Sequence, residues 1–414
     1  MKIVVFEDEG YKNLHPLTLF RPAFELRCGF TTLLEKIARK FPEYPFLLFT
    51  RDYLIPTLKK RWAYSINKLE ELKEDDILFL NGRVLVDKNF SLEPEGEEIS
   101  GRKGNQVVYL RAKKETTRKI QYSSLAELIE KLSSLLPSRE VEDTLINYPW
   151  DLINLNGEAI EDDFQHVGGK ILGSLSSQAS IIGDKGKVFI GKGAIVHPFV
   201  ALDVREGPII IDEEVEIYPG SHIQGPTAIG KKSHIVGAKV REGCSFGPVS
   251  MIGGEVEESI FQGYANKFHE GFLGHAYIGE WVNLGALCTN SDLKNTYGPV
   301  KVYINGEMMN SGELKVGSFV GDHAKLGIGT LLNTGTVIGA GSNVFGGEMP
   351  PKFVPSFSWG SGKEFVEFRL EKALATARVV MSRRDVVMSE EDAELIKKVF
   401  ELTQAEREKF GVRR

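Results

Sequence analysis

Residues 211–235 read IDEEVEIYPGSHIQGPTAIGKKSHI, and this stretch decides the fold of the chain. An isoleucine stands at every sixth position: Ile211, Ile217, Ile223, Ile229 and Ile235. A period of six fits neither an α-helix nor a strand alone, whose side chains repeat about every 3.6 and every two residues. It fits a short strand followed by a corner, repeated many times.

The same spacing returns later in the chain, together with small residues at a fixed offset. The second series is Leu314, Val320, Leu326, Leu332, Ile338 and Val344. Small residues stand four places after the key residues, at Ser221, Thr227, Ser233, Ala324, Thr330, Thr336 and Ser342. We expect the aliphatic side chains to point into a narrow core and the small ones to fit where its walls converge. Glycine, which often follows the key residue, tolerates the positive φ angles of corners.

Residues 170–349 are therefore predicted to form a hexapeptide-repeat β-solenoid, whose coils stack at the strand spacing of about 4.8 Å. Ordinary amphipathic strands are the alternative, but they alternate every second residue and would not hold a phase of six. The phase breaks at residues 263–276 and 288–313. Insertions in solenoids project from one side and often form the binding face.

Composition excludes several classes of function. The 414 residues are 42% hydrophobic and 26% charged, which predicts two or three folded domains. A net charge of −6 without a basic stripe argues against a nucleic-acid partner. The first apolar run is too short for a signal peptide, and no stretch approaches the roughly 20 apolar residues of a membrane span. The three cysteines are scattered, so we expect no disulfide framework and a reduced, cytoplasmic protein.

The regions before and after the solenoid have other patterns. Residues 1–150 alternate short apolar strands, at 2–6, 45–50 and 77–80, with helical segments at 31–41 and after 114. This alternation predicts an α/β domain with a mainly parallel sheet that binds ligands near its strand ends. Residues 151–169 are predicted to be a linker, and residues 350–414 to be C-terminal helices that cap the solenoid or mediate assembly. Ser389 is expected to be the N-cap of the last helix.

Three motifs carry a family resemblance: GYANKFHEGFLG at 263–274, GEWVNLGA at 279–286 and FVPSFSWG at 353–360. With an α/β domain before the solenoid, the chain resembles the bifunctional N-acetylglucosamine-1-phosphate uridylyltransferase and glucosamine-1-phosphate acetyltransferase family. It is most similar to a branch of sugar nucleotidyltransferases with a divergent first domain. The resemblance implies a left-handed, three-sided parallel β-helix. It also implies a homotrimer with active sites between neighbouring prisms.

The resemblance assigns an acetyltransferase site to the solenoid. His269 matches the family histidine that takes a proton from the acceptor amine, and imidazole suits this task because its pKa lies near working pH. The alternative is a surface histidine without a role. The implied substrate contacts are Lys267, Asn283, Lys239 and Asn266. A family lysine that holds the sugar phosphate falls at Glu257, whose carboxylate we expect to repel a phosphate, and a family tyrosine falls at Phe272.

Acetyl-CoA, or another acyl-CoA, is the implied co-substrate, and we expect it to lie along the coils after Leu326. Its predicted contacts are Gly327, Gly329, Thr330 and Asn333, because small residues let a pantetheine arm approach the backbone. One hexapeptide family binds zinc, which needs three converging imidazoles. The histidines of this chain have no such spacing, so no metal site is predicted.

The first domain departs from the family at its nucleotide site. Sugar nucleotidyltransferases cradle the triphosphate with a glycine-rich loop after the first strand. Here residues 7–13 read EDEGYKN, and we expect their three carboxylates to repel a triphosphate. The aspartate that binds Mg²⁺ in the family falls at Arg83, which cannot ligate it, so Mg²⁺ is expected only if this site is active. Arg21 and Arg27 are candidates for a phosphate site; the alternative is that they are surface arginines.

Three hypotheses follow for the function. The first is acyl transfer from CoA to a sugar-type acceptor at the solenoid, within sugar-nucleotide or cell-envelope precursor metabolism. The second is sugar-1-phosphate nucleotidyl transfer in the first domain. The third is a non-catalytic trimeric binding protein. In each case the expected ligand is a sugar phosphate or a sugar nucleotide.

Overall fold

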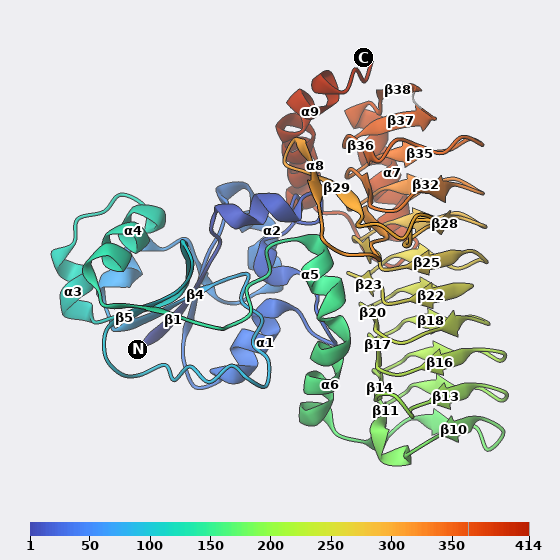
Figure 1. Cartoon of the computed structure of the whole chain (residues 1–414), viewed down its shortest axis with the longest axis horizontal. Coiled ribbons are helices and arrows are strands. Elements are labelled where there is room, and N and C mark those ends of the chain that lie inside the picture. The colour runs from blue at the N-terminus through green and yellow to red at the C-terminus, as the bar shows by residue number, and fades with distance from the viewer. Residues whose placement is uncertain (363, 414) are drawn as a thin grey trace. The chain divides into compact units, whose positions relative to one another are not determined.

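The computed structural model of the chain describes residues 1–362 and 364–413. The chain divides into two compact units. The N-terminal unit comprises residues 1–12, 21–26 and 32–147, and the β-helix unit comprises residues 13–20, 27–31 and 148–414. Figure 1 shows both, coloured along the chain.

The N-terminal unit is built on a mixed seven-stranded sheet. In spatial order its strands are β3 (Ser65–Ile66), β2 (Phe46–Phe49), β1 (Lys2–Phe6), β4 (Ile77–Asn81), β6 (Gln106–Ala112), β5 (Ile99–Lys103) and β7 (Ser138–Glu140). The first four run parallel, and β6 runs antiparallel to β4. Ile3 and Val5 lie in one apolar core and Val4 and Phe6 in another, because successive side chains of a strand point to opposite faces.

Helices accompany this sheet in the alternation that the sequence predicts. They are α1 (Leu33–Lys40), α2 (Ile55–Arg61), α3 (Lys114–Lys119) and α4 (Leu125–Leu135). A capping box begins α1, in which the Thr32 side chain accepts from the Glu35 amide and the Glu35 side chain accepts from the Thr32 amide. The α/β class predicted for this region is confirmed.

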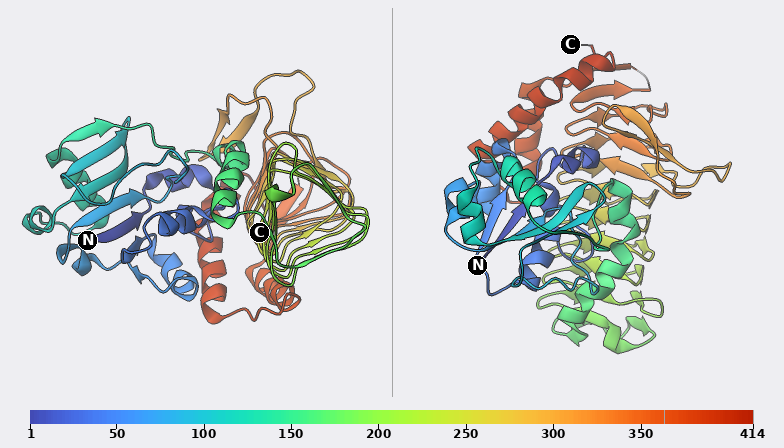
Figure 2. Two further views of the ribbon diagram at one scale, coloured as in Figure 1. Left: turned by 90° about the horizontal axis from the view of Figure 1, so that it is seen from below. Right: turned by 60° about the vertical axis from the view of Figure 1, so that its left-hand side comes forward.

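The β-helix is a stack of coils with three faces, seen end-on in the left view of Figure 2. The ten-strand face contains β8 (Lys170–Ile171), β11 (Val188–Ile190), β14 (Ile209–Ile211), β17 (Thr227–Ile229), β20 (Cys244–Phe246), β23 (Ile260–Phe261), β26 (Tyr277–Ile278), β31 (Ser318–Val320), β34 (Thr336–Ile338) and β36 (Phe353–Val354). The six-strand face contains β10 (Ser180–Ile182), β13 (Ala201–Asp203), β16 (His222–Gln224), β19 (Lys239–Val240), β22 (Glu255–Glu257) and β25 (Phe272–Gly274).

The third face has eleven strands, ten of them parallel in sequence order and the last one antiparallel. They are β9 (Ser174–Leu175), β12 (Ile195–Val196), β15 (Glu216–Ile217), β18 (His234–Ile235), β21 (Met251–Ile252), β24 (Asn266–Lys267), β27 (Asn283–Leu284), β32 (Lys325–Leu326), β35 (Asn343–Val344), β37 (Ser358–Ser361) and β38 (Glu364–Glu367). The predicted parallel β-helix is confirmed; the sense of its winding remains what the resemblance implies.

The hexad pattern explains the interior of the β-helix. All five isoleucines of the 211–235 stretch are fully buried, as are the small residues that follow at the fixed offset. In the second series Leu314 is the exception, because it is 52% exposed in the insertion that precedes the later coils. The repeat therefore resumes at Val320, after that insertion.

Two predictions about the repeat need correction. Residues 263–276 do not interrupt the solenoid, because they form β24 and β25. Ile217 pairs with Ile235, 18 residues on, whereas the next two coils take 17 residues to Ile252 and 15 residues to Lys267, so shorter coils shift the phase without breaking the stack. The solenoid also continues beyond residue 349: β36 and β37 add another coil, and the prolines at 350, 351 and 355 lie at its corners.

The second predicted interruption is real. β28 (Thr289–Asn290) pairs with β33 (Leu331–Leu332), and between them an insertion forms the antiparallel hairpin of β29 (Lys301–Ile304) and β30 (Glu307–Asn310). β27 nevertheless pairs directly with β32. The insertion therefore leaves at a corner and returns without disturbing the coils.

Helices flank the coils at both ends of the unit. The segment predicted as a linker forms α5 (Pro149–Asn154) and α6 (Asn156–Val167), and Ile160 packs against Ile210 and Ala228 of the ten-strand face. At the other end lie α7 (Leu370–Ser382), α8 (Glu390–Leu402) and α9 (Gln404–Lys409). The predicted N-cap is confirmed, since the Ser389 hydroxyl accepts from the Asp392 amide at 3.2 Å.

Candidate active site

His269 lies in an exposed turn, residues 268–271, that connects β24 on the eleven-strand face to β25 on the six-strand face. Its ring meets that of Phe268 edge-on, with 5.3 Å between ring centroids. The imidazole is thus presented to solvent, as a group must be that takes a proton from a substrate. Nothing in the turn sequesters it in the core.

The turn of His269 is one of a stack that forms a corner of the prism. Leu287 N donates to Glu270 O at 2.8 Å, and Gly329 N donates to Ala286 O at 2.8 Å, so the turns of three successive coils are bonded to one another. We call residues 253–254, 268–271, 285–288 and 327–330 the His269 corner. The turn at 327–330 stands two coils from that of His269, or about 10 Å at the usual strand spacing.

The residues predicted to bind CoA divide at this corner. Gly329 has a φ of +67° and open space where a side chain would start, and the neighbouring Ile328 is 76% exposed. Asn333, beyond β33, is exposed. Thr330 is buried and its hydroxyl donates to Gly327 O at 2.8 Å, so it packs the corner and the prediction that it contacts CoA is wrong. A side chain at Gly327 would meet Phe345 of the next coil, so this glycine serves packing.

Lys267, a predicted substrate contact, is 1% exposed and lies inside the β-helix. It occupies the position that Ile252 has in the preceding coil. Its Nζ donates to the carbonyl oxygens of Gly253 at 3.1 Å and His269 at 3.0 Å. Burial lowers the pKa of Lys267 to about 8. The predicted substrate contact is therefore wrong, because the hexad phase turns this side chain inward.

Asn266 and Asn283 lie side by side on the outer side of the eleven-strand face. They are register partners on β24 and β27, and Asn266 Nδ2 donates to Asn283 Oδ1 at 2.9 Å. Both side chains are half-buried. The structure thus brings these two predicted substrate contacts together, and Asn266 lies three residues before His269.

Lys239 is exposed on the six-strand face, opposite Glu255 of the next coil. On the same face Glu257 is almost buried, with Arg241 Nη1 at 2.7 Å and Lys315 Nζ at 3.3 Å from its oxygens. The prediction that Glu257 repels a phosphate did not take Arg241 and Lys315 into account. Arg241 and Lys315 thus neutralise Glu257, and Arg241 Nη2 also lies 3.7 Å from Glu242 Oε1.

A buried histidine near the insertion was missed by the sequence reasoning. His275 is 4% exposed, with Nε2 at 2.6 Å from Glu258 and Nδ1 at 2.9 Å from Asp292. Burial disfavours its charged form, but the two carboxylates outweigh this and raise the pKa of His275 to about 9. At neutral pH an imidazolium therefore joins three successive coils at the base of the insertion.

In the N-terminal unit the first loop is neutralised from within. Glu7 accepts from Arg51 Nε and Nη2, both at 3.1 Å, and from the Ala23 amide at 2.8 Å. Asp8 accepts from Arg83 Nε and Nη2, both at 2.7 Å. Burial would raise the pKa of Asp8, but Arg83 holds it below its usual value. The expected repulsion of a triphosphate by these carboxylates is thus largely cancelled.

The pairing of Asp8 with Arg83 also argues against the Mg²⁺ site that the family resemblance implies. Arg83 is 1% exposed and also donates to Ile146 O at 2.6 Å, and a side chain at Gly10 would collide with its guanidinium. Asp8 has both oxygens engaged by this arginine. Mg²⁺ needs free carboxylate oxygens. The residues of this loop therefore do not fit a bound Mg²⁺.

A cavity of about 690 Å³ lies beside this loop, at the carboxyl ends of β1 and β2. Its lining includes Tyr11, Arg51, Asn67, Arg102, Ser123 and Ser124. Its volume suits a drug-sized or nucleotide-sized ligand. Arg21 is buried and not among the described lining residues, and Arg27 belongs to the other unit, where its amide donates to Tyr277 Oη at 2.8 Å. The two arginines predicted to hold a phosphate thus belong to different units.

Comparison with known proteins identifies one matching family model and several similar proteins. Residues 3–170 match the family model described as sugar nucleotidyl transferase. A bifunctional sugar-1-phosphate nucleotidylyltransferase/acetyltransferase from Sulfurisphaera tokodaii is 30% identical over 207 residues, 49% of this chain and 44% of the relative. The bifunctional protein GlmU of Wigglesworthia glossinidia brevipalpis is 27% identical over 173 residues, 40% of this chain and 31% of the relative. The chain thus spans less than half of these relatives, and the resemblance inferred from its motifs is confirmed.

Among solved structures, a UDP-N-acetylglucosamine acyltransferase of Francisella novicida is 12% identical with a TM-score of 0.33. The similarity covers 57% of this chain and 77% of that one. The sugar nucleotidyl transferase match ends at Lys170, where β8 begins the coils.

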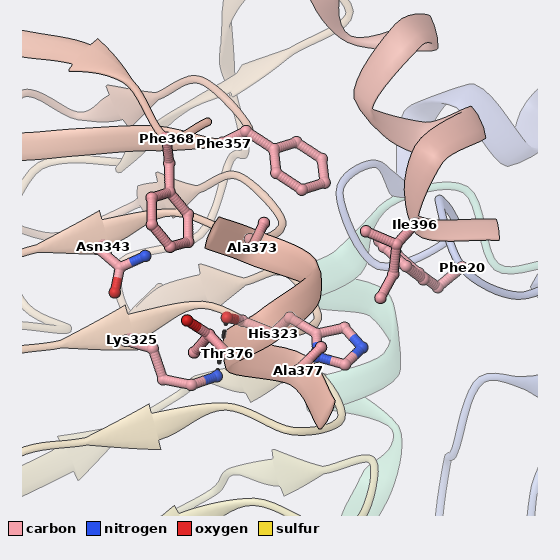
Figure 3. A pocket seen from close by; sticks show the side chains of 11 residues that line it. Phe20, His323, Lys325, Asn343, Phe357, Phe368, Ala373, Thr376, Ala377 and Ile396 are labelled. Carbon is pink, nitrogen blue, oxygen red and sulfur yellow. Dashed lines mark hydrogen bonds between the residues drawn. The ribbon is translucent and has the colours of Figure 1, made fainter. Parts of the chain in front are cut away.

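A small enclosed pocket lies under α7, within the β-helix unit (Figure 3). Its volume is about 10 Å³, roughly the space of one water. Lys325 lies there, and its Nζ donates to Trp281 O at 2.7 Å and His323 O at 2.8 Å. Burial lowers the pKa of Lys325 to about 7.

Across residues 1–362 and 364–413 there is no group of three or more His, Cys, Asp or Glu side chains arranged to hold a metal ion. Within the same residues no helix has the length and apolar character needed to cross a bilayer.

Proposed function

We propose that the β-helix unit transfers an acyl group from a CoA thioester to an amino group of a sugar-type acceptor. One observation carries the proposal: an exposed histidine shares a corner with the open turn at Gly329, about 10 Å away along the stack. The amine of one substrate and the thioester of the other would then meet at His269. The names of the curated relatives, which include acetyltransferases, support the same chemistry.

His269 acts in this proposal as the general base. The acceptor nitrogen attacks the thioester carbonyl, the new N–C bond forms and the C–S bond breaks. The proton lost by nitrogen goes to the imidazole, which returns it to the departing thiolate of CoA. Asn266 and Asn283, joined by a hydrogen bond, supply amide groups beside the turn that can hold the acceptor or the developing oxyanion.

The acceptor is proposed to carry a phosphate or a nucleotide. Arg241 and Lys315 are both half-exposed beside Glu257, and Lys239 lies on the same face. Glu242, Glu255 and Glu257 lie beside these cations, so the patch would hold a phosphate through hydrogen bonds from its exposed guanidinium and ammonium groups rather than through a net positive charge. Guanidinium and ammonium groups of this kind bind phosphate oxygens through charge-assisted hydrogen bonds.

The proposed homotrimer and cytoplasmic location remain predictions; light scattering that gives a stable monomer of 46.1 kDa would contradict the trimer.

The test compares variants of two histidines. Purified protein is incubated with acetyl-CoA and a series of amino-sugar 1-phosphates, and release of the CoA thiol is followed. His269→Ala should lower the rate by roughly 10²- to 10⁴-fold, the usual contribution of a general base. His166→Ala removes another exposed histidine, in the last turn of α6, and should leave the rate unchanged. Equal rates in wild type and His269→Ala would reject the role of His269.

Nucleotidyl transfer in the N-terminal unit is the second candidate function, favoured by the family match and by the 690 Å³ cavity. The pairing of Asp8 with Arg83 weighs against it, because the guanidinium engages both oxygens of this carboxylate. Release of pyrophosphate from a nucleoside triphosphate and a sugar 1-phosphate, dependent on Mg²⁺, would establish it. If neither reaction occurs, the non-catalytic binding protein remains.

A further inference from the structure

One inward column of the β-helix contains a residue that its pattern does not predict. From β12 to β35 the inward positions of the eleven-strand face are Val196, Ile217, Ile235, Ile252, Lys267, Leu284, Leu326 and Val344. Every one of them is aliphatic except Lys267. A buried ammonium is costly unless its hydrogen bonds are made, so its presence in this column calls for an explanation.

The ammonium of Lys267 binds backbone rather than substrate. Nζ donates to Gly253 O, in the turn of the preceding coil, and to His269 O, in the turn of its own coil. Gly254 makes room for it, because a side chain there would start 2.9 Å from Nζ. Lys267 therefore ties together two turns of the His269 corner from the inside.

We infer that Lys267 is a positioning residue: from within the coil, its ammonium fixes the turn that presents His269 to the acceptor. The inference deepens the proposed acyltransferase function and rests on it. A base must hold its nitrogen within hydrogen-bond reach of the amine, and a misplacement of about 1 Å can lower a rate about 10²-fold. An exposed turn on a stack of short strands has few other ties to the interior, and this one bonds the carbonyl of His269 itself.

A second lysine of the β-helix also joins two turns through their carbonyl oxygens. Lys325 Nζ bonds the carbonyl oxygens of Trp281 and His323, which belong to turns of two successive coils at another corner (Figure 3). Lys325 points outward, under α7, whereas Lys267 points inward. Each lysine bonds one carbonyl oxygen in a turn of the preceding coil and one in a turn of its own coil, but only Lys267 holds the turn of His269. Lys325→Met is therefore a matched control.

The experiment uses the full-length protein and three variants. Lys267→Met replaces the ammonium by an apolar side chain of similar length that suits the column. Lys325→Met removes the equivalent tie at the other corner, and Leu284→Met tests repacking of the same column one coil on. Thermal unfolding, hydrogen exchange of the peptide 266–274, and steady-state kinetics with acetyl-CoA are measured for each.

Lys267→Met should keep or raise the melting temperature, because a buried charge is removed from an apolar column. It should accelerate exchange of residues 268–271 by about 10-fold or more, since local opening governs exchange. It should lower kcat by about 10²-fold with the KM for acetyl-CoA unchanged. Leu284→Met should change none of these, and Lys325→Met should leave the 266–274 peptide unaffected.

Three outcomes would overturn the inference. Unchanged exchange at 268–271 in folded Lys267→Met would show that the turn does not depend on the ammonium. Faster exchange without loss of kcat would show that the turn does not position a base. Failure of Lys267→Met to fold, with Leu284→Met folded, would make Lys267 a structural requirement. Absence of acyl transfer in the wild type rejects the proposed function instead, and is distinguished because exchange is read without any substrate.

Discussion

The first loop of the N-terminal unit and the His269 corner of the β-helix treat charge in opposite ways. In the loop, the carboxylates of Glu7 and Asp8 are held by Arg51 and Arg83, so the charged groups satisfy one another. At the corner, the interior lysine bonds only backbone and the histidine is left exposed. The charged groups of the loop thus support one another, whereas the His269 corner is supported by bonds to backbone oxygens.

Breaking the internal pairing of the N-terminal unit should give the largest effect on stability. Arg83→Met leaves Asp8 half-buried without its guanidinium and frees Ile146 O, so unfolding should be easier by about 3–5 kcal/mol. Urea denaturation measures it. Lys12→Met, which removes the exposed pair with Glu9, should change stability by less than about 1 kcal/mol. Similar losses in both variants would contradict the structural role given to Arg83.

The pH dependence of the β-helix should reveal His275. Its folded pKa of about 9 lies above the usual value of 6.5, so its contribution is fully present below pH 6.5 and is lost as the pH rises through 9. The full contribution is on the order of 3 kcal/mol. Urea denaturation of wild type and His275→Gln between pH 6 and pH 10 measures it, and the difference isolates His275 because Lys267 and Lys325 titrate in both proteins. A difference that stays constant with pH would show that the imidazole is not charged.

The cation patch on the six-strand face should matter for the acceptor alone. Arg241→Ala removes one of the two cations beside Glu257 and should raise the KM for a phosphorylated acceptor about 10-fold, with the KM for acetyl-CoA unchanged. Arg205→Ala is the control, since this exposed arginine, two coils away on the same face, pairs with Asp203. If both variants behave alike, the acceptor does not use this patch.

The smallest expected effect is that of Mg²⁺. Because Arg83 occupies both oxygens of Asp8, millimolar Mg²⁺ should shift the melting temperature by less than about 1 °C. Acetyl-CoA at 100 times its Kd should instead stabilise the β-helix by about 2.7 kcal/mol. A clear stabilisation by Mg²⁺ that is lost in Asp8→Asn would reveal a metal site in the loop after all.

The fold could be predicted because its signal is local and periodic. A β-helix repeats one environment, so the spacing of Ile211 and the isoleucines that follow it predicts the buried positions without any knowledge of distant contacts. The phase was lost where the coils are shorter. Counting in sixes from Ile252 reaches Glu258 and Tyr264, whereas the inward residues are Val256, Phe261 and Lys267. The corners differ in length from coil to coil, and a count in steps of six does not show which corner is shorter.

The candidate site was predictable only in part, because its contacts run between coils. His269 was found through the family motif, but the inward direction of Lys267 requires the register of the strands. A signal for the His275 cluster was present in the sequence: Glu258, His275 and Asp292 follow one another at intervals of 17 residues, the length of a coil. Asn266 and Asn283 share that interval. The pairing of Asp8 with Arg83 has no such period and could not be foreseen.

The insertion between β28 and β31 has a consequence for how such a protein can change. Leu284 and Leu326 stack as neighbours although the chain makes a long excursion between them, and an isolated bridge between Leu293 and Lys315 closes the base of that excursion. The hairpin of this excursion packs back on the later coils, because Val300 and Val302 are fully buried and the ring of Tyr303 lies 4.0 Å from that of Phe353, centroid to centroid. A different loop can therefore be grafted at residues 294–299, whereas replacing residues 300–304 would remove a buried contact of those coils.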